Sequence, residues 1–339
     1  MPTANLLAAV ILAGLPTLGY LFILNLLDRY EKEPWRLMLA CVGAGAILAP
    51  LVSIGVLRLV GHDASLAPQL APGAAGADPL VAIVEELVKG LLLIAVVRLI
   101  RDEFDDVIDG VVYGAAVGAG FAASETFLYV LGGVGGLGQG TLFLLLLAGL
   151  GHACYGAVTG AALGFASRLA DRRQAVVVIA YGLASAALFH ALHDALSFIL
   201  ARLVERPDAG VGFLTLLLGS GLNFIGLVAL GVLIIFAWRN ESQVLREQLA
   251  PEVEGGLVSA RDYQDLSSTR ARIGRQLGFL RARNPRRARA QRQMYAALGE
   301  LAFHKRRAAN AKRHAPDSAR DTRLRLRIQD LGKQLGEGG

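Results

Sequence analysis

The chain has 339 residues, of which 54% are hydrophobic and 18% are charged, and its mean hydropathy is +0.48. Ordinary soluble domains contain about 25% charged residues, so this composition excludes a typical soluble globular protein. The two cysteines, Cys41 and Cys154, are too few for a disulfide framework. We therefore expect an all-α, polytopic membrane protein.

Seven apolar runs are each long enough to cross a bilayer, which takes about 17–25 helical residues. They lie near residues 4–27, 37–60, 80–100, 107–131, 141–167, 175–201 and 212–238. This pattern predicts a membrane helix bundle of about seven transmembrane helices, which forms a membrane-embedded domain over residues 1–238.

The remaining residues, 239–339, form a strongly basic tail. They contain 22 of the 34 lysines and arginines but 11 of the 28 acidic residues, which gives a net charge of +11. Basic sequence beside a membrane helix is attracted to anionic lipid headgroups. Nucleic-acid binding is not favoured, because no aromatic-interleaved or groove-reading motif accompanies the arginines. We expect a cytoplasmic tail that is partly helical.

Lysine and arginine are unequally distributed between alternate loops. Loops 28–36, 98–106 and 168–174 contain eight of them, whereas loops 61–79, 132–140 and 202–211 contain two. Positively charged loops remain in the cytoplasm. The expected protein is a multi-pass protein of the cell membrane, with its N-terminus outside and its C-terminus in the cytoplasm.

Charged residues and histidines interrupt four of the apolar runs. A charge in a transmembrane helix costs at least about 2.5–3.5 kcal/mol, so such residues usually line a polar interior and are functional. The eight residues are Glu85, Glu86, Lys89, Glu125, His152, His190, His193 and Asp194.

Helical spacing predicts contacts among these residues. Lys89 follows Glu85 by four positions and Glu86 by three, so its ammonium group can pair with either carboxylate. His190 and Asp194 are four positions apart and lie on one helix face.

The expected orientation also gives a depth for five of these residues: Glu85, Glu125, His152, His190 and Asp194. At a rise of about 1.5 Å per residue, they all fall between the outer leaflet and the midplane of the membrane. One shared polar site is the simplest explanation.

Two of the helices carry rows of small residues at four-residue spacing. One row is Gly110, Gly114, Gly118 and Ala122, and the other is His152, Gly156, Gly160 and Gly164. Such rows allow helix backbones to approach closely, so we expect the face that carries His152 to meet a neighbouring helix.

Carboxylates and imidazoles in one site can activate water by general-base catalysis and can stabilise an oxyanion. They can also hold a zinc ion, which binds histidine and carboxylate ligands. The residue types alone leave both routes open.

Five short motifs occur along the membrane body. They are Asp28-Arg-Tyr-Glu-Lys-Glu-Pro34, Glu85-Glu86-Leu-Val-Lys89, Asp109-Gly-Val-Val-Tyr-Gly114 leading into Gly120-Phe-Ala-Ala-Ser-Glu125, His152 before its glycine row, and His190-Ala-Leu-His-Asp194. In this order, over roughly residues 20–200, the chain resembles the PrsW-type intramembrane protease family, distant relatives of the CAAX prenyl proteases.

The resemblance implies a membrane endopeptidase that cuts a membrane-anchored protein, such as an anti-sigma factor, near its extracytoplasmic side. It implies that Glu85 and Glu86 are the essential pair, with Glu85 or Glu86 as the base, and that Glu125, His152 and His190 complete the site. Those three residues, with Asp194, are the candidate ligands for zinc. Lys89 is the expected charge partner of the glutamates, and a metal-free mechanism is the alternative.

Two other classes of function compete with proteolysis. Buried Glu, His and Lys also form proton relays in transporters, although the chain shows neither an inverted repeat nor paired helices broken by proline. A non-catalytic scaffold that binds a partner's helix is the third class.

Overall fold

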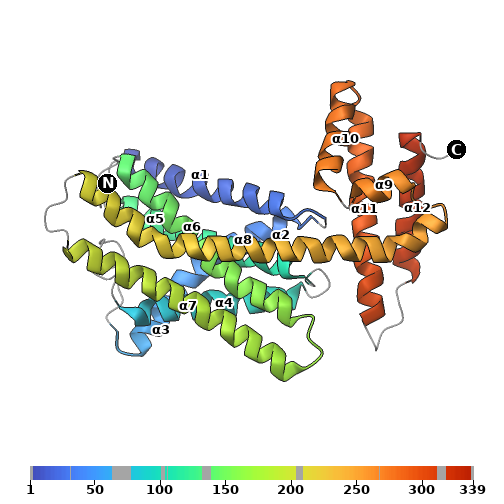
Figure 1. Cartoon of the computed structure of the whole chain (residues 1–339). Coiled ribbons are helices and arrows are strands. Elements are labelled where there is room, and N and C mark those ends of the chain that lie inside the picture. The colour runs from blue at the N-terminus through green and yellow to red at the C-terminus, as the bar shows by residue number, and fades with distance from the viewer. Residues whose placement is uncertain are drawn as a thin grey trace. The chain divides into compact units, whose positions relative to one another are not determined.

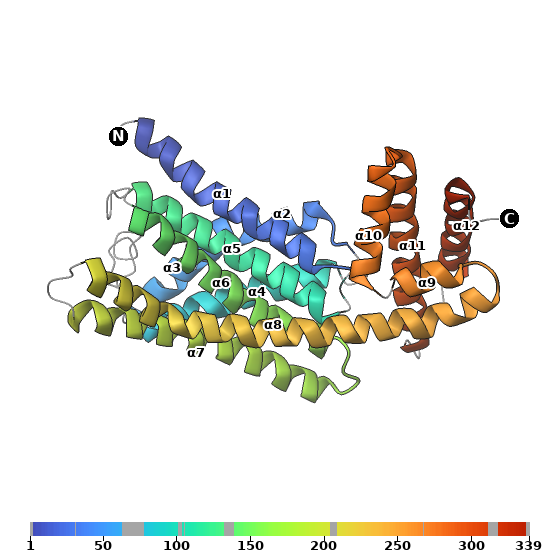
Figure 2. The same ribbon diagram turned by 45° about the horizontal axis from the view of Figure 1, so that its top comes forward.

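The computed structural model describes residues 3–30, 32–62, 78–100, 104, 106–131, 139–203, 209–266, 268–310 and 318–336. Within these ranges the regular secondary structure is entirely helical (Figures 1 and 2). The chain forms two compact units. The membrane unit comprises Met1–Asp28 and Glu33–Ile234, and the C-terminal unit comprises Arg29–Lys32 and Ile235–Gly339.

The helices of the membrane unit follow the apolar runs of the sequence. They are α1 (Thr3–Leu27), α2 (Trp35–Gly43), which continues through a π-helical turn (Ala44–Leu48) into α3 (Ala49–Leu59), then α4 (Pro79–Leu99), α5 (Val107–Leu131), α6 (Gln139–Ala166), α7 (Arg172–Leu203) and the first part of α8 (Ala209–Glu254). In the part of the chain that the structure describes, five helical segments are long and apolar enough to cross a membrane. The total of seven spans remains a prediction.

Helix α5 forms the centre of the membrane unit. Every residue from Val107 to Ala122 is buried. The helix packs against α6, α1 and α2, and Figure 2 shows it running alongside α6 and α1. The many small residues of α5 let the backbones of neighbouring helices approach closely. Such close packing holds membrane helices together, because lipid supplies no hydrophobic force between them.

The two predicted rows of small residues face each other. A Cβ atom placed on Gly114 would lie 2.1 Å from the carbonyl oxygen of Gly156, and one on Gly118 would lie 2.0 Å from that of His152. Only glycine fits such a backbone approach, so these positions determine the distance between α5 and α6. The expectation that the His152 face meets a neighbouring helix is confirmed.

Carboxylates fix the start of α5. Asp106 Oδ1 accepts a hydrogen bond from the Ile108 N–H at 2.7 Å, and Asp109 Oδ2 accepts one from the Asp106 N–H at 2.9 Å. This reciprocal pattern satisfies backbone donors that the first helical turn leaves unpaired. Arg168, just beyond α6, lies 2.5 Å from Asp106 Oδ2 and so ties the end of α6 to the start of α5.

The motif at 28–34 also contacts α5. The buried Glu33 carboxylate accepts a hydrogen bond from the hydroxyl of Tyr113, and Asp28 Oδ2 accepts one from the Glu33 N–H at 2.6 Å. These contacts fix the segment before α2 against α5. The motif at 28–34 and the motif that contains Tyr113 therefore meet in a structural contact. The hydrogen bonds of this contact do not involve the glutamates of α4.

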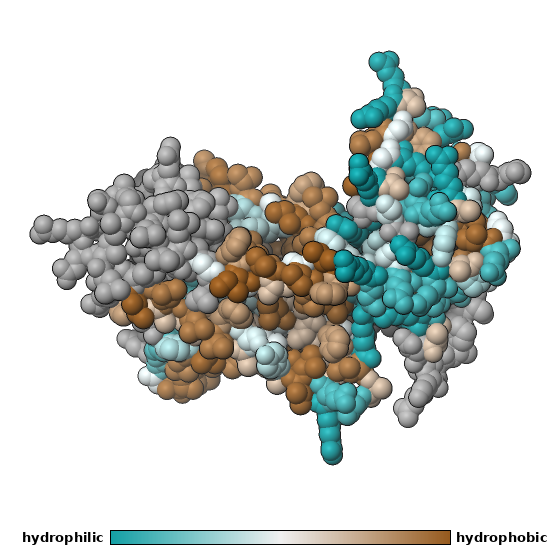
Figure 3. All heavy atoms as spheres, in the orientation of Figure 1, coloured by the Kyte–Doolittle hydropathy of each residue, from teal (hydrophilic) through white to brown (hydrophobic). Residues whose placement is uncertain are grey.

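Large apolar side chains cover much of the described surface of the membrane unit. Leu15 on α1, Leu51 on α3 and Val177 on α7 are 67%, 61% and 67% exposed. On the face that Figure 3 shows, the described residues of this unit are mainly brown and those of the C-terminal unit mainly teal. Such a surface suits contact with lipid chains, and a soluble monomer rarely shows apolar patches of this extent.

The C-terminal unit contains the end of α8, α9 (Ala260–Leu266), α10 (Thr269–Arg281), α11 (Pro285–Asn310) and α12 (Ser318–Leu335). Its buried core includes Leu245, Leu249, Leu298, Leu301 and Ile328. The sequence predicted a basic, partly helical tail from residue 239, and the structure has a compact unit that comprises Ile235–Gly339 together with Arg29–Lys32.

One buried glutamate joins three helices of the C-terminal unit. Glu252 on α8 lies 3.0 Å from Lys305 Nζ on α11 and 2.6 Å from Arg325 Nη2 on α12. Because ionised donors and acceptors form the stronger hydrogen bonds, this contact stabilises the packing of α8, α11 and α12.

Candidate active site

Helix α4 contributes Glu85, Glu86 and Lys89, and all three side chains are buried. The Lys89 ammonium group contacts Glu86 Oε1, so Glu86 is the glutamate with which the lysine pairs. Helical rotation by about 100° per residue directs Glu85 to a different side. The other oxygen of Glu86, Oε2, is buried and has no hydrogen-bond partner among the described residues.

Helix α6 places His152 between two charged groups. Its Nδ1 atom lies 3.2 Å from Lys89 Nζ, and its Nε2 atom lies 2.8 Å from Glu125 Oε2 on α5. An ammonium group has no lone pair, so Nδ1 must accept the hydrogen bond and Nε2 must carry the proton that it donates to Glu125. This arrangement fixes the tautomer of the neutral ring.

Helix α7 contributes His190, whose ring is faced by carboxylates on both sides. Its Nδ1 atom lies 2.8 Å from Glu86 Oε1, and its Nε2 atom lies 3.4 Å from Asp194 Oδ2 and 4.0 Å from Glu85 Oε2. The expected pairing of His190 with Asp194 across one helical turn is present in the structure.

Aromatic side chains form the walls of the site. Tyr155 stacks on His190 with ring centroids 5.0 Å apart, and Phe121 lies 5.1 Å from His152. Lys89 Nζ is 4.3 Å from the centroid of Phe121, within the range of a cation–π contact. The sequence reasoning missed both aromatic residues, although Tyr155 follows His152 by three positions and shares its helix face.

Burial differs across the site. The side chains of Glu85, Glu86, Lys89, His152 and His190 are 7% exposed or less, whereas those of Glu125 and Asp194 are 37% and 29% exposed. The site is therefore closed around α4 and more open where Glu125 and Asp194 lie. His193, which the sequence also singled out, is half-buried.

The structure thus joins the seven predicted residues in one network from four helices. Among the described residues, Glu86, His152 and His190 offer ligand atoms that all lie within 4.8 Å of one another. The sequence had grouped His152 and His190 with Glu125 and Asp194. In the structure these two carboxylates contact the Nε2 atoms of the two rings, while Glu86 and Lys89 lie on the Nδ1 side.

A bundle of membrane-length helices with this buried network defines a multi-pass membrane protein that has an internal polar site. Residues 33–220 match the model of a family described as "PrsW family intramembrane metalloprotease". The chain therefore belongs to the PrsW family of intramembrane proteases, as its five motifs predicted.

Two similar proteins are both named "Protease PrsW". The protein from Bacillus subtilis (strain 168) is 31% identical over 201 residues, which cover 58% of this chain and 84% of the relative. The protein from Geobacillus kaustophilus (strain HTA426) is 32% identical over 173 residues, which cover 50% of this chain and 70% of the relative. No solved structure matches the chain.

The family description implies a metal ion, and the residues present fit one. Zinc binds histidine nitrogens and carboxylate oxygens, and Glu86, His152 and His190 bring such atoms together. The unpartnered Oε2 of Glu86 provides a further acceptor. Carboxylates on the far nitrogens of both rings match the way in which ligating histidines are usually oriented.

Proposed function

We propose that this protein hydrolyses a peptide bond of a membrane-anchored protein, such as an anti-sigma factor, near its extracytoplasmic side. The observation that carries the proposal is the buried network in which Glu86 joins Lys89 and His190, while Lys89 reaches His152. Carboxylates, imidazoles and an ammonium group supply a base, proton carriers and a positive charge, which are the groups that amide hydrolysis needs.

Loop charges support the extracytoplasmic side. Glu85 lies in the first two turns of α4 and Glu125 in the last two turns of α5. Both ends adjoin loops of the sequence that lack lysine and arginine, 61–79 and 132–140. The positive-inside rule assigns such loops to the outer face. The greater exposure of Glu125 and Asp194 suits substrate entry from that side.

In this mechanism Glu85 is the general base. Glu86 Oε1 is already engaged by Lys89 and His190, so Glu86 serves to hold positive charge in the site. Glu85 removes a proton from water as the water oxygen attacks the carbonyl carbon, and it returns that proton to the leaving amine. The Nε2 atom of His190 lies 4.0 Å from Glu85 Oε2, which is within the range of an ion pair but beyond that of a direct hydrogen bond.

The positive charge of the site stabilises the oxyanion. A metal ion held by Glu86, His152 and His190 would polarise the carbonyl oxygen and acidify the attacking water. Without a metal, the ammonium group of Lys89 supplies the charge. Glu125 and Asp194 hold the two imidazole rings through their Nε2 atoms and thus keep their Nδ1 atoms turned to Glu86 and Lys89.

The test compares membrane proteins from cells that express the wild type, Glu85→Gln, Glu86→Gln or the control Glu247→Gln. Glu247 is an exposed carboxylate of the C-terminal unit. The wild type and the control should generate the same new protein termini, within or beside transmembrane segments on their outer side. Each site variant should reduce these fragments by at least about 100-fold. Equal fragment levels in all four strains would refute the proposal.

The same orientation places the C-terminal unit in the cytoplasm. Its net positive charge would then face the anionic headgroups of the inner leaflet, which attract polybasic segments beside a membrane helix. Salt screens this attraction, so with the full chain in nanodiscs, raising the ionic strength should reduce the protection that anionic lipid gives the C-terminal unit against added protease.

A further inference from the structure

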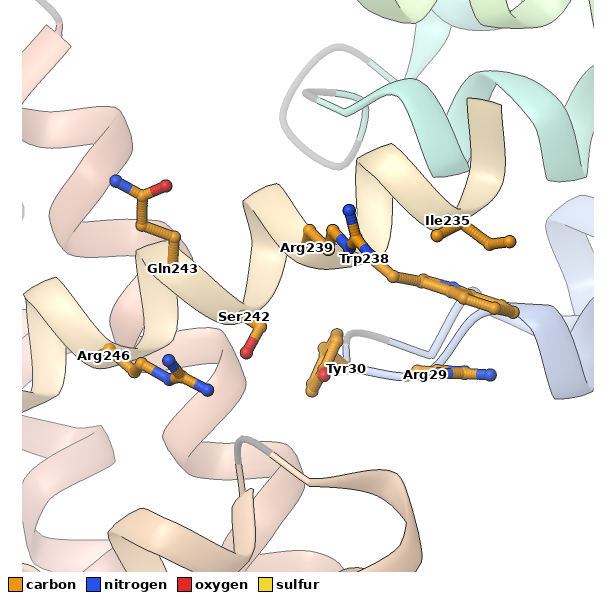
Figure 4. A pocket seen from close by; sticks show the side chains of 8 residues that line it. All are labelled: Arg29, Tyr30, Ile235, Trp238, Arg239, Ser242, Gln243 and Arg246. Carbon is orange, nitrogen blue, oxygen red and sulfur yellow. The ribbon is translucent and has the colours of Figure 1, made fainter. Parts of the chain in front are cut away.

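The C-terminal unit contains a cavity of about 560 Å³ that the proposed proteolysis does not use. It is lined by Arg29, Tyr30, Ile235, Trp238, Arg239, Ser242, Gln243 and Arg246 (Figure 4). Two segments that are far apart in the sequence form it, namely the residues after α1 and the stretch of α8 that follows its apolar run.

The lining residues of α8 share one face of the helix. Arg239, Ser242 and Arg246 are spaced by three and four residues, which places them one above another. Figure 4 shows Ser242 and Arg246 on the side of the helix where Tyr30 lies. The hydroxyl and the guanidinium groups are hydrogen-bond donors, and guanidinium binds phosphate through two parallel bonds.

The guanidinium group of Arg29 stacks on Trp238, with its carbon 3.2 Å from the ring centroid. Behind it, Arg272 donates a hydrogen bond to the Arg29 carbonyl oxygen at 2.8 Å, and its guanidinium carbon lies 4.5 Å from the ring centroid of Tyr30. Burial lowers the pKa of Arg272, and the charge of Arg29 acts in the same direction. An anion would relieve this crowding of positive charge.

The acidic neighbours leave two arginines available. Glu241 is the carboxylate whose charge influences Arg29 and Arg272. Within the described ranges, neither Arg239 nor Arg246 forms an ion pair, and both are exposed. Their donors can therefore reach a ligand without first breaking a salt bridge.

The position along α8 indicates the source of the anion. The apolar run of the helix ends at Trp238, and Arg239 is the first charged residue after it. Tryptophan favours the interface between hydrocarbon and headgroups, where arginines meet lipid phosphates. A cavity at this level, with an aromatic ring on its apolar side and arginines on its polar side, matches a phospholipid headgroup.

We propose that this cavity binds the phosphate group of an anionic phospholipid, with Arg239 and Arg246 as its principal ligands and Arg29 and Ser242 as further donors. The bound headgroup would bridge α8 and the segment after α1, both of which belong to the C-terminal unit. This proposal is independent of the proteolytic chemistry, since none of these residues belongs to the network around Glu86.

The full chain is the material for the test, with Arg239→Gln/Arg246→Gln as the pocket variant. The matched control is Arg270→Gln/Arg281→Gln, which removes the same charge from exposed arginines outside the cavity. Each protein is extracted from membranes of mixed phosphatidylglycerol and phosphatidylcholine, and retained lipid is measured by native mass spectrometry. The pocket variant should retain phosphatidylglycerol about 30-fold more weakly than the wild type, whereas the control should match the wild type.

A second measurement identifies the source of the phosphate. The chain has two tryptophans, so Trp35→Phe leaves Trp238 as the sole reporter in the cavity wall. In nanodiscs, phosphatidylglycerol should shift Trp238 emission and inorganic phosphate should not. A shift with inorganic phosphate that Arg239→Gln/Arg246→Gln abolishes would assign the cavity to a soluble phosphate and overturn the lipid source. Equal lipid retention by the pocket and control variants would overturn the site itself.

Discussion

The Nδ1 atom of His190 lies 2.8 Å from the Oε1 atom of Glu86, although 104 positions separate the two residues in the sequence. The contact joins α7 to α4 within the membrane unit. Because both side chains are buried, it is shielded from water, and its loss should affect the stability of the fold as well as the chemistry.

The first prediction is that Glu86 and His190 contribute to stability as a pair. In a double-mutant cycle with Glu86→Gln and His190→Gln, the coupling free energy should be about 0.5–3 kcal/mol. The measurement is reversible unfolding of the full chain in detergent. Combining Glu86→Gln with Asp171→Asn, an exposed site before α7, should give additive effects. Additivity for both pairs would show that the contact is energetically unimportant.

The second prediction concerns Lys89, whose ammonium group contacts the atoms of Glu86 and His152 that a metal would use. A nitrogen lone pair cannot bind an ammonium proton and a metal ion together, so Lys89 competes with metal at this position. The variant Lys89→Met should lose about 3–5 kcal/mol of stability without metal, because a buried carboxylate loses its partner. Zinc should raise its melting temperature more than that of the wild type.

The appropriate control for this experiment is Lys305→Met, which also removes a lysine from a glutamate, Glu252, but in the C-terminal unit. It should lower stability without altering the response to zinc. If Lys89→Met and the wild type respond equally to zinc, with chelator as the reference, the metal does not bind at the atoms that Lys89 contacts.

The third prediction is that the close approach of α5 and α6 cannot accommodate a side chain. A Cβ atom on Gly114 would lie 2.1 Å from the backbone of Gly156, whereas one on Gly231 of α8 meets nothing within 4 Å. Gly114→Val should therefore destabilise the chain by at least about 1–3 kcal/mol, and Gly231→Val should cost far less. Thermal unfolding compares the two. Gly114→Val should also move His152 away from Glu125 and Lys89, because the contact between α5 and α6 positions α6.

The fourth prediction tests the C-terminal unit. Glu252→Gln removes the charge that Lys305 and Arg325 share, and we expect a loss of about 2 kcal/mol. Limited proteolysis of the full chain should then cut the connections among α8, α11 and α12 faster. Glu247→Gln, an exposed change on the same helix, should leave the cleavage rate unchanged. The same rate for both variants would exclude Glu252 as a structural contact.

The sequence was sufficient to predict the helical membrane body and the association of its polar residues. The reason is physical: charges in apolar helices are costly unless they meet, and their depths placed Glu85, Glu125, His152, His190 and Asp194 in one layer of the membrane. Their spacing along each helix also predicted the pair of His190 and Asp194, which needs only one helical turn.

The choice of partners between helices was beyond the sequence. Glu85 and Glu86 are equally good partners for Lys89 by spacing, and the selection of Glu86 depends on where α6 and α7 place His152 and His190. The rotation of α6 and α7 about their own axes decides which ring atoms face α4. It turns the Nδ1 atoms of His152 and His190 toward Lys89 and Glu86. A single sequence contains no measure of this rotation, so Glu86 was not among the expected metal ligands, although Glu125 and Asp194 do contact the two histidines.

Tyr30 has a consequence for the modularity of the protein. It follows α1, yet its side chain belongs to the buried core of the C-terminal unit, and its carbonyl oxygen lies 2.7 Å from where a Cβ atom on Gly299 would be. The unit is thus discontinuous in the chain, assembled from an early tetrapeptide and the final hundred or so residues. During synthesis, Arg29–Lys32 are made directly after the first membrane helix. They can pack into the C-terminal unit only after α11 has been translated. Grafting this unit onto another protein, or replacing it with that of a relative, would require both pieces to be transplanted together.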